Sequence, residues 1–207
     1  MNDSISFKSK IKFVHNIDFL KNYSRGTNIG YTHCEPNVLK SDVFYTKSIR
    51  TCTGGGLVTP QKGCLGFHIW DDMVNKKNFE KIAHSIIRWL NPAERGLLIG
   101  AKALKGSDYS IEQFKRFKEF LSKHVPNLSI FEKHQHECSQ SHISYSLKDD
   151  TWFIASDFLD NVTGEYYQVN NLETLRKAFE NIKIAKGDEL YIGEMKINPK
   201  DAPDLFS

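Results

Sequence analysis

The chain has 207 residues, of which 40% are hydrophobic and 26% charged, with 14 Phe, 8 Tyr and 3 Trp. This supply of apolar side chains excludes a mainly disordered chain, and the length fits one globular domain, alone or with an extension. The net charge of +3 and the scattered lysines and arginines argue against a nucleic-acid partner.

Neither a membrane span nor a secretion signal is expected. No apolar run approaches the ~20 residues that cross a bilayer, and residues 1–12 lack the apolar centre of a signal peptide. The four cysteines, Cys34, Cys52, Cys64 and Cys138, are too few and too widely spaced for a disulfide framework. We therefore expect a reducing compartment, either the cytoplasm or a host cytosol reached without an N-terminal signal.

The first third of the chain is predicted to be rich in strands. Residues 5–14 and 38–46 have strand-like patterns and are separated by a loop-like stretch over residues 23–37. A third unit, residues 49–70, contains the turn residues Thr59-Pro60-Gln61-Lys62-Gly63 between apolar flanks. This pattern predicts a β-hairpin.

Two helices and two strands are predicted to follow. Residues 78–90 place their apolar side chains on one helical stripe, which Asn91-Pro92 ends, and residues 95–104 contain an apolar run typical of a buried strand. Ser110 and Gln113 have the spacing of a capping box that opens a second helix, which ends before Pro126. Residues 128–131 form the next predicted strand.

The rest of the chain is predicted to add more strands and one more helix. Strands are expected at residues 142–147 and 152–155, then a β-α-β unit from a strand at 165–169, a helix at 172–182 capped by Asn170 and Glu173, and a strand at 189–194. The final dozen residues are expected to be a loose end. The sequence thus predicts an α+β fold, a β-rich sandwich-like core with mixed sheets and packed helices. We divide it into a catalytic domain at 1–158 and a C-terminal extension at 159–207 packed on that domain.

Cys52 and His68 are the strongest candidates for catalysis. A hairpin that reverses between Thr59 and Gly63 brings Cys52 opposite His68 or within a few residues of it. A thiol is a weak nucleophile at its unperturbed pKa of about 8.5, and an adjacent imidazole favours the thiolate and can protonate a leaving amine. This pairing is typical of enzymes that cleave amides.

The residues that follow Cys52 are predicted to bind the substrate. Gly54, Gly55 and Gly56 remove side chains beside the thiol, so a substrate side chain could approach there. Their backbone N–H groups would be available to a developing oxyanion. We assign substrate binding to Thr53, Gly54 and Gly55.

This pattern resembles the bacterial chemoreceptor glutamine deamidases, CheD. The resemblance lies in Thr46 six residues before Cys52 and in His68 after a short hairpin, and it covers roughly residues 38–156. A related fold with the same Cys and His arrangement occurs in cytotoxic necrotizing factor toxins and in N-terminal asparagine amidohydrolases. The chain departs from CheD in Ile49-Arg50-Thr51 before the cysteine, in the three glycines after it and in Phe67 before the histidine.

The resemblance implies a layered fold and a cysteine-dependent protein glutamine deamidase, with Cys52 as nucleophile, His68 as base and acid, and Thr46 as orienting residue. It implies no cofactor and a protein partner that carries the target amide, which for a bacterial effector would be a host protein. Hydrolysis of an N-terminal asparagine amide and transglutamination are alternatives on the same dyad. A protein-binding module that keeps the fold without catalysis is the alternative outside enzymes.

Two other groups of residues are candidates for a functional role besides Cys52 and His68. His134, His136, Cys138 and His142 are all metal-ligating types, but no second pair of ligands accompanies them, so we expect a polar loop and no metal site. In that case His142 could lie near the catalytic residues on a neighbouring strand. Cys64 is expected to pack in the core, although the hairpin leaves a Cys52–Cys64 disulfide conceivable.

Overall fold

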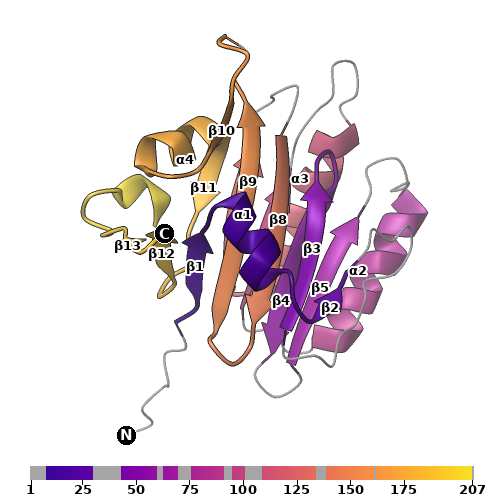
Figure 1. The fold of residues 1–207 in the computed structure, drawn as a ribbon. Coiled ribbons are helices and arrows are strands. Elements are labelled where there is room, and N and C mark those ends of the chain that lie inside the picture. The colour runs from indigo at the N-terminus through magenta and orange to yellow at the C-terminus, as the bar shows by residue number, and fades with distance from the viewer. Residues whose placement is uncertain are drawn as a thin grey trace, which may run out of the picture.

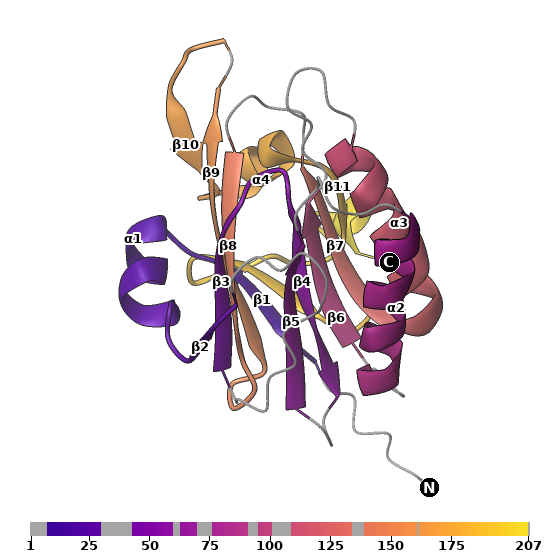
Figure 2. The same cartoon turned by 90° about the vertical axis from the view of Figure 1, so that its right-hand side faces the viewer.

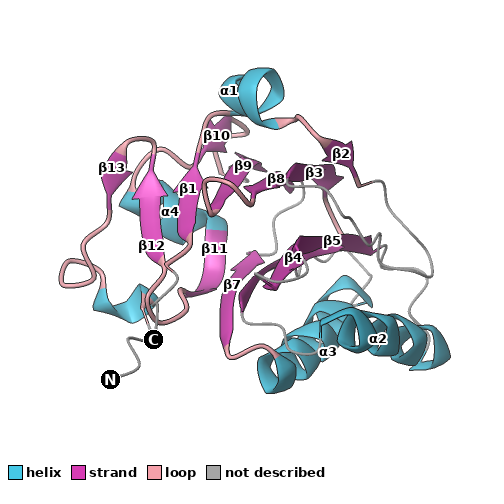
Figure 3. Cartoon of the chain, turned by 90° about the horizontal axis from the view of Figure 1, so that it is seen from below, coloured by secondary structure: helices cyan, strands magenta, loops and turns pink. Residues whose placement is uncertain are grey.

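The structure, a computed structural model, describes residues 8–29, 43–59, 63–69, 76–90, 95–100, 109–133, 139–160 and 162–206. Within these ranges it contains an eight-stranded sheet A and a five-stranded sheet B, which face each other (Figures 1 and 3). Sheet A consists of β1 (Lys10–Phe13), β2 (Thr27–Asn28), β3 (Val43–Ile49), β8 (Ser139–Ser146), β9 (Thr151–Leu159), β10 (Tyr166–Gln168), β12 (Glu189–Ile192) and β13 (Met195–Lys196). Sheet B consists of β4 (Thr53–Thr59), β5 (Gly63–Ile69), β6 (Arg95–Gly100), β7 (Asn127–Lys133) and β11 (Phe179–Lys183).

Helices cover the outer face of sheet B. In Figure 3, α2 (Lys76–Leu90) and α3 (Tyr109–His124) lie side by side on the face that points away from sheet A. The remaining described helices are α1 (Asn16–Asp18), which continues as the π-helix η1 (Phe19–Tyr23), α4 (Leu172–Ala178) and the short 3-10 helix η3 (Pro203–Leu205). None of the helices in the described ranges is both long and apolar enough to cross a membrane.

Both sheets are mixed. In sheet A, β1 runs parallel to β9 and β12, whereas β8 and β9 are antiparallel. In sheet B, β6 and β7 are parallel, and β4 is antiparallel to β5 and β6. The predicted fold class, α+β with mixed sheets and packed helices, is therefore confirmed.

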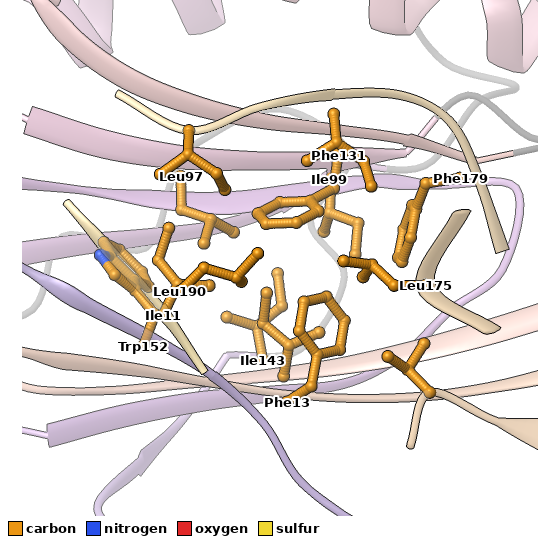
Figure 4. Close-up of a cluster of buried hydrophobic side chains, with 14 of the residues drawn as sticks. Ile11, Phe13, Leu97, Ile99, Phe131, Ile143, Trp152, Leu175, Phe179 and Leu190 are labelled. Carbon is orange, nitrogen blue, oxygen red and sulfur yellow. The ribbon is translucent and has the colours of Figure 1, made fainter. Parts of the chain in front are cut away.

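The apolar core has two parts, one on each side of sheet B. The larger part fills the space between the sheets and includes Phe13, Phe131, Trp152 and Phe179 (Figure 4). The second lies between sheet B and the helices, where Phe67 of β5 meets Phe117 of α3. Side chains of β4, β5 and β6 alternate between the two parts, because successive residues of a strand point to opposite faces. This explains why all six residues of β6 are buried, as the apolar run predicted.

The hairpin formed by β4 and β5 has the predicted arrangement. Thr53 pairs with Ile69, Gly54 with His68 and Thr59 with Gly63, so one register runs along the whole ladder. Turn residues 60–62 lie outside the described residues, as do the predicted helix stop at 91–92 and residues 101–104 of the predicted strand. The predicted helix at 78–90 is confirmed and begins two residues earlier, at Lys76.

Three predicted elements differ from the structure. The predicted helix at 172–182 ends at Ala178, and the chain continues as β11, because pairing with β7 satisfies the backbone of residues 179–183. Asn171, with Thr174, caps this helix instead of Asn170 with Glu173. The predicted loop at 23–37 contains β2, and its residues 30–37 lie outside the described residues.

The last residues are not the loose end that the sequence suggested. Ala202 and Leu205 are buried in the core between the sheets. The backbone N–H of Ile184 donates a hydrogen bond to the carbonyl of Leu205 at 2.7 Å, and Phe206 forms a β-bridge with Ile184. Burial of these apolar side chains offsets the entropy lost when the tail is ordered.

Candidate active site

Thr46 and His68 join the two sheets where the edges that contain β3 and β5 approach each other (Figure 2). The Thr46 hydroxyl of β3 and Nδ1 of the His68 imidazole of β5 share a hydrogen bond of 2.7 Å. Both side chains are fully buried, at 0% exposure. In a site screened from water this bond fixes the rotation of the imidazole ring more strongly than an exposed bond would. The structure thus brings together two of the three residues predicted to be catalytic.

Cys52 lies one residue before β4, at the end of the connection from β3. Its side chain belongs to the core cluster between the sheets and is 7% exposed. Gly54, two residues later, pairs directly with His68, so the register places Cys52 within two positions of the histidine along the hairpin. Diagonal neighbours of this kind lie on one face of a sheet and within reach of longer side chains. This arrangement is compatible with the predicted Cys52–His68 dyad.

The connection between β3 and Cys52 has an irregular backbone. The pairing of β3 with β8 shifts between Thr46 and Ile49, where β3 contains one more residue than β8 does. Ser48, in this bulge, has a φ of 61°, a left-handed conformation that a non-glycine residue seldom adopts. Bulges and left-handed residues cost free energy, and they persist where surrounding contacts hold them.

Side chains from three other elements hold this connection. The backbone N–H of Ser48 donates to Nδ1 of His142 on β8 at 3.0 Å, and Lys133 of β7 donates from Nζ to the carbonyl of Ile49 at 2.6 Å. The hydroxyl of Ser110 on α3 donates to the carbonyl of Thr51. Residues 48–51 are therefore anchored from β8, β7 and α3 immediately before Cys52.

Ser110 and Gln113 do not form the predicted capping box. Helix α3 begins at Tyr109, so Ser110 is already inside the helix, and its hydroxyl binds Thr51. The Gln113 side-chain amide donates to the hydroxyl of Thr53 and to the carbonyl of Ile69, each at 3.1 Å. The polar side chains at the start of α3 thus bind the strands beside the candidate site rather than the end of their own helix.

The predicted substrate-binding residues lie in β4 but not all on the face of Cys52. Thr53 is bonded to Gln113 of α3, so its side chain points toward the helices, away from the core between the sheets. At Gly54 a Cβ would collide with the side chain of Ile49, and at Gly55 it would collide with the carbonyl of Leu97 and the ring of Phe67. Close packing therefore accounts for these glycines without a ligand, and their substrate-binding role stays a prediction.

Burial is the main influence on the protonation of His68. Burial, together with a smaller effect from the positive charge of Lys133, lowers the imidazole pKa from 6.5 to about 4. The ring is therefore neutral at neutral pH and able to accept a proton. The pKa of His142 is also lowered to about 4, chiefly by burial, although the Asp157 carboxylate opposes this shift.

Cys64 is a buried core residue, as expected, and it is distant from Cys52 along the hairpin. It pairs with Val58, six positions along β4 from Cys52, and both cysteines are present as thiols. The conceivable Cys52–Cys64 disulfide is therefore wrong, because the register separates the two residues by several strand positions.

The cluster around residues 134–142 is only partly described. The described residues do not include His134, His136 and Cys138, nor Cys34 elsewhere in the chain. His142 is described and lies beside the connection before Cys52. Within the part of the chain that the structure describes, no three His, Cys, Asp or Glu residues are arranged to hold a metal ion.

Lys133 and Ser110 are the site residues whose role the sequence did not reveal. Lys133 follows a strand-like apolar run, and nothing near it in the sequence indicates a buried amine. Ser110 has the spacing of a capping box with Gln113, but its hydrogen-bond partner, Thr51, is 59 residues away. In comparisons with known proteins, no protein-family model and no curated protein sequence matches the chain.

Proposed function

We propose that the chain is a cysteine-dependent protein glutamine deamidase with Cys52 as nucleophile, His68 as general base and acid, and Thr46 as the residue that orients His68. The observation that carries the proposal is the 2.7 Å hydrogen bond between Thr46 and His68 beside Cys52. A buried imidazole that is oriented by a third group, with a thiol within two strand positions of it, supports a cysteine nucleophile with a histidine base.

The first half of the reaction forms a thioester. In the tautomer that this mechanism uses, Nδ1–H of His68 donates to Thr46 and Nε2 accepts the thiol proton. Sγ of Cys52 attacks the carboxamide carbon, and its proton passes to His68. The C–N bond then breaks as His68 returns this proton to the departing nitrogen, so ammonia leaves and the acyl group stays on sulfur.

The second half hydrolyses the thioester. A water molecule attacks the acyl carbon while its proton passes to His68, and a new C–O bond forms. The C–S bond then breaks, and His68 returns the proton to sulfur. Glutamine has become glutamate, the free thiol is restored, and no oxidant or cofactor is consumed.

The burial of the dyad favours a side-chain amide as the target. Cys52 is 7% exposed and His68 is 0% exposed, so a bulky peptide backbone is a poor fit to the thiol. Glutamine presents its amide at the end of a slender chain, one methylene longer than that of asparagine. We therefore expect glutamine to be a better substrate than an N-terminal asparagine, the alternative on this dyad.

A protein with exposed glutamines is the partner that this chemistry requires. The two described cysteines are thiols, which suits a reducing compartment. We therefore place the reaction in a cytosol, either that of the producing cell or, for a bacterial effector, that of its host.

The test uses internal-glutamine peptides and N-terminal-asparagine peptides, with release of ammonia and the mass change of deamidation as readouts. We expect ammonia from the glutamine peptides with the wild type and none with Cys52→Ser. Cys64→Ser is the matched control, because Cys64 is buried in the same core cluster and should leave the activity intact. Ammonia release that persists in Cys52→Ser would exclude this mechanism.

The remaining outcomes separate the alternatives. Activity confined to the N-terminal asparagine peptides would select the amidohydrolase, and incorporation of an added primary amine would select transglutamination. A folded protein that releases no ammonia from any peptide would favour the binding module.

A further inference from the structure

A cavity of about 320 Å³ lies at the carboxyl ends of β1 and β12. These two parallel strands end side by side at the pair Phe13–Ile192, and their chains then leave in different directions. β1 continues into α1 and η1, on the face of sheet A that points away from sheet B, whereas β12 turns back into β13 (Figure 3). A crevice at the carboxyl ends of strands, where neighbouring chains diverge, is a common place for a ligand site.

This cavity is separate from the candidate active site. In sheet A, β9 and β8 lie between β1 and β3, the strand that carries Thr46. Thr46, Cys52 and His68 do not line the cavity. The proposed deamidation therefore gives no account of it.

Three polar side chains of the cavity wall have no partner in the described part of the chain. His15, Asp18 and Asn22 form no side-chain hydrogen bond and no ion pair with the described residues. Asn170, on the opposite wall, uses its side-chain oxygen for the hydroxyl of Thr174 and keeps its amide N–H groups as donors. A carboxylate, an imidazole and two amides suit a ligand whose groups both donate and accept hydrogen bonds, as hydroxyl groups do.

The charges of the wall argue against an anionic ligand. Lys12 is ion-paired with Glu194 at 2.6 Å, whereas Asp18 has no described partner of opposite charge. An anion would meet an unpaired carboxylate, and the ammonium group of the described wall is already taken. An ammonium ligand could pair with Asp18, but it would leave the amide N–H groups of Asn22 and Asn170 without acceptors.

Tyr23 adds an apolar surface to the same cavity. Its ring stacks on that of Phe153 in β9, with the ring centroids 3.9 Å apart and 16° between the planes. An aromatic ring held in this way can cover the C–H groups of a sugar ring, while the hydroxyl groups meet the polar side chains. Small-molecule sites enclose about 300–1,000 Å³, so this cavity fits one sugar ring better than a chain of several.

We propose that this cavity binds a neutral, polyhydroxylated ligand of the size of one sugar ring. Asp18, Asn22 and Asn170 bind its hydroxyl groups, and Tyr23 packs against its C–H groups. The site goes beyond the proposed deamidase and does not depend on it, because it shares no residue with the candidate dyad.

Titration of the protein with sugars, followed by the NMR signals of its backbone amides, tests the proposal. The neutral probes are methyl glucoside, methyl galactoside and N-acetylglucosamine, with glucuronate as the anionic probe and glucosamine as the cationic one. We expect at least one neutral probe to shift the amide signals of Asp18, Asn22 and Gly193 in a saturable way. Glucuronate should bind more weakly than this neutral probe, because it meets the Asp18 carboxylate.

Two variants test the location of the site. Asp18→Ala removes an exposed carboxylate and should weaken binding at least about tenfold, the value of one hydrogen bond to a charged group. Gly193 lines the cavity with a φ of 59°, which asparagine tolerates, and a Cβ there meets no atom within 4 Å. Gly193→Asn should therefore fold normally and narrow the cavity, so that the affinity falls. Gly164→Asn is the matched control, because Gly164 has a φ of 71° and equally open surroundings in the turn after β9.

The result that would overturn the proposal is equally specific. Neutral sugars that leave these amide signals unchanged, or that bind the wild type, Asp18→Ala and Gly193→Asn with one affinity, would exclude this site. Tighter binding of glucuronate or of glucosamine than of every neutral probe would mean that the cavity selects charge, against the proposal. None of these outcomes bears on ammonia release, so the cavity and the deamidase stand or fall separately.

Discussion

The imidazole of His142 accepts a hydrogen bond from the backbone N–H of Ser48, with 3.0 Å between the two nitrogen atoms. Because Nδ1 is the acceptor, the neutral ring carries its proton on Nε2. The bond satisfies the amide of a residue with a φ of 61°, and the ring stacks on Phe19 of η1 on its other side. A side chain of sheet A thus stabilises the unusual backbone that leads to Cys52.

His142→Leu should therefore destabilise the protein by about 1–2 kcal/mol, because the partly buried N–H of Ser48 loses its acceptor. His142→Gln should cost less, since its side-chain oxygen can accept the same hydrogen bond. Urea denaturation measures both free energies of unfolding. Equal losses in the two variants would mean that packing on Phe19, and not the hydrogen bond, is what the histidine provides.

The two buried histidines predict a loss of stability in acid. Each has a pKa of about 4 in the folded protein and about 6.5 when unfolded, so the unfolded chain binds more protons between these values. Stability is fully present above pH 6.5 and falls as the pH drops toward 4, by up to about 3 kcal/mol for each histidine. His142→Gln should make the dependence of the unfolding free energy on pH less steep, and an unchanged slope would contradict the low pKa of His142.

Asp188 should change the stability with pH in the direction opposite to that of the two histidines. Burial raises its carboxyl pKa from 3.8 to about 6, although hydrogen bonds from Ser129 and the backbone of Ser9 partly oppose the shift. The folded state then binds more protons than the unfolded state between these values, so this group stabilises the fold as the pH falls from 6 toward 4. In Asp188→Asn this compensation is lost, and we expect denaturation curves to show a steeper loss of stability in acid than in the wild type.

Thr46→Val should impair both stability and reactivity. Valine has nearly the shape of threonine but leaves Nδ1 of His68 without its hydroxyl partner, at a cost of about 1–3 kcal/mol. The ring is then no longer oriented, and we expect deamidation to slow by at least about tenfold. Thr46→Ser keeps the hydroxyl and should restore most of the rate, which a merely space-filling role of Thr46 would not predict.

Gly54 and Ile49 should show coupled effects. A Cβ at position 54 would collide with Cδ1 of Ile49, so Gly54→Ala should cost about 1–3 kcal/mol through overpacking. Ile49→Val removes that methyl group, so Gly54→Ala should lower the free energy of unfolding by less in the Ile49→Val background. A double-mutant cycle measured by denaturation gives the coupling energy, and strictly additive losses would show that the collision is relieved elsewhere.

The local part of the site could be predicted from the sequence. The register of the β4–β5 hairpin depends on a short turn, and that turn alone brought Cys52 near His68. The anchors of the intervening segment could not be predicted in the same way. Lys133 and His142 bind it from 84 and 94 residues away, and no spacing in the sequence marks such contacts.

The boundary between α4 and β11 shows a different limit. The apolar residues Leu175, Ala178, Phe179 and Ile182 fit one stripe of a helix, and all four are buried in the core between the sheets. The helix nevertheless ends at Ala178, because the unpaired edge of β7 offers hydrogen bonds to the residues that follow. A periodic pattern indicates which side chains are buried, but a distant strand decides which backbone conformation buries them.

The position of β1 has a consequence for folding during synthesis on the ribosome. This first described strand lies between β9 and β12 and runs parallel to both, so its second neighbour consists of residues 189–192. Nascent chains in which residues 189–192 are still inside the exit tunnel expose one edge of β1. One edge of β7 is likewise unpaired until β11 has been synthesised. Because such distant pairings form late and slowly, chaperones that cover unpaired strand edges should associate with the chain until synthesis is nearly finished.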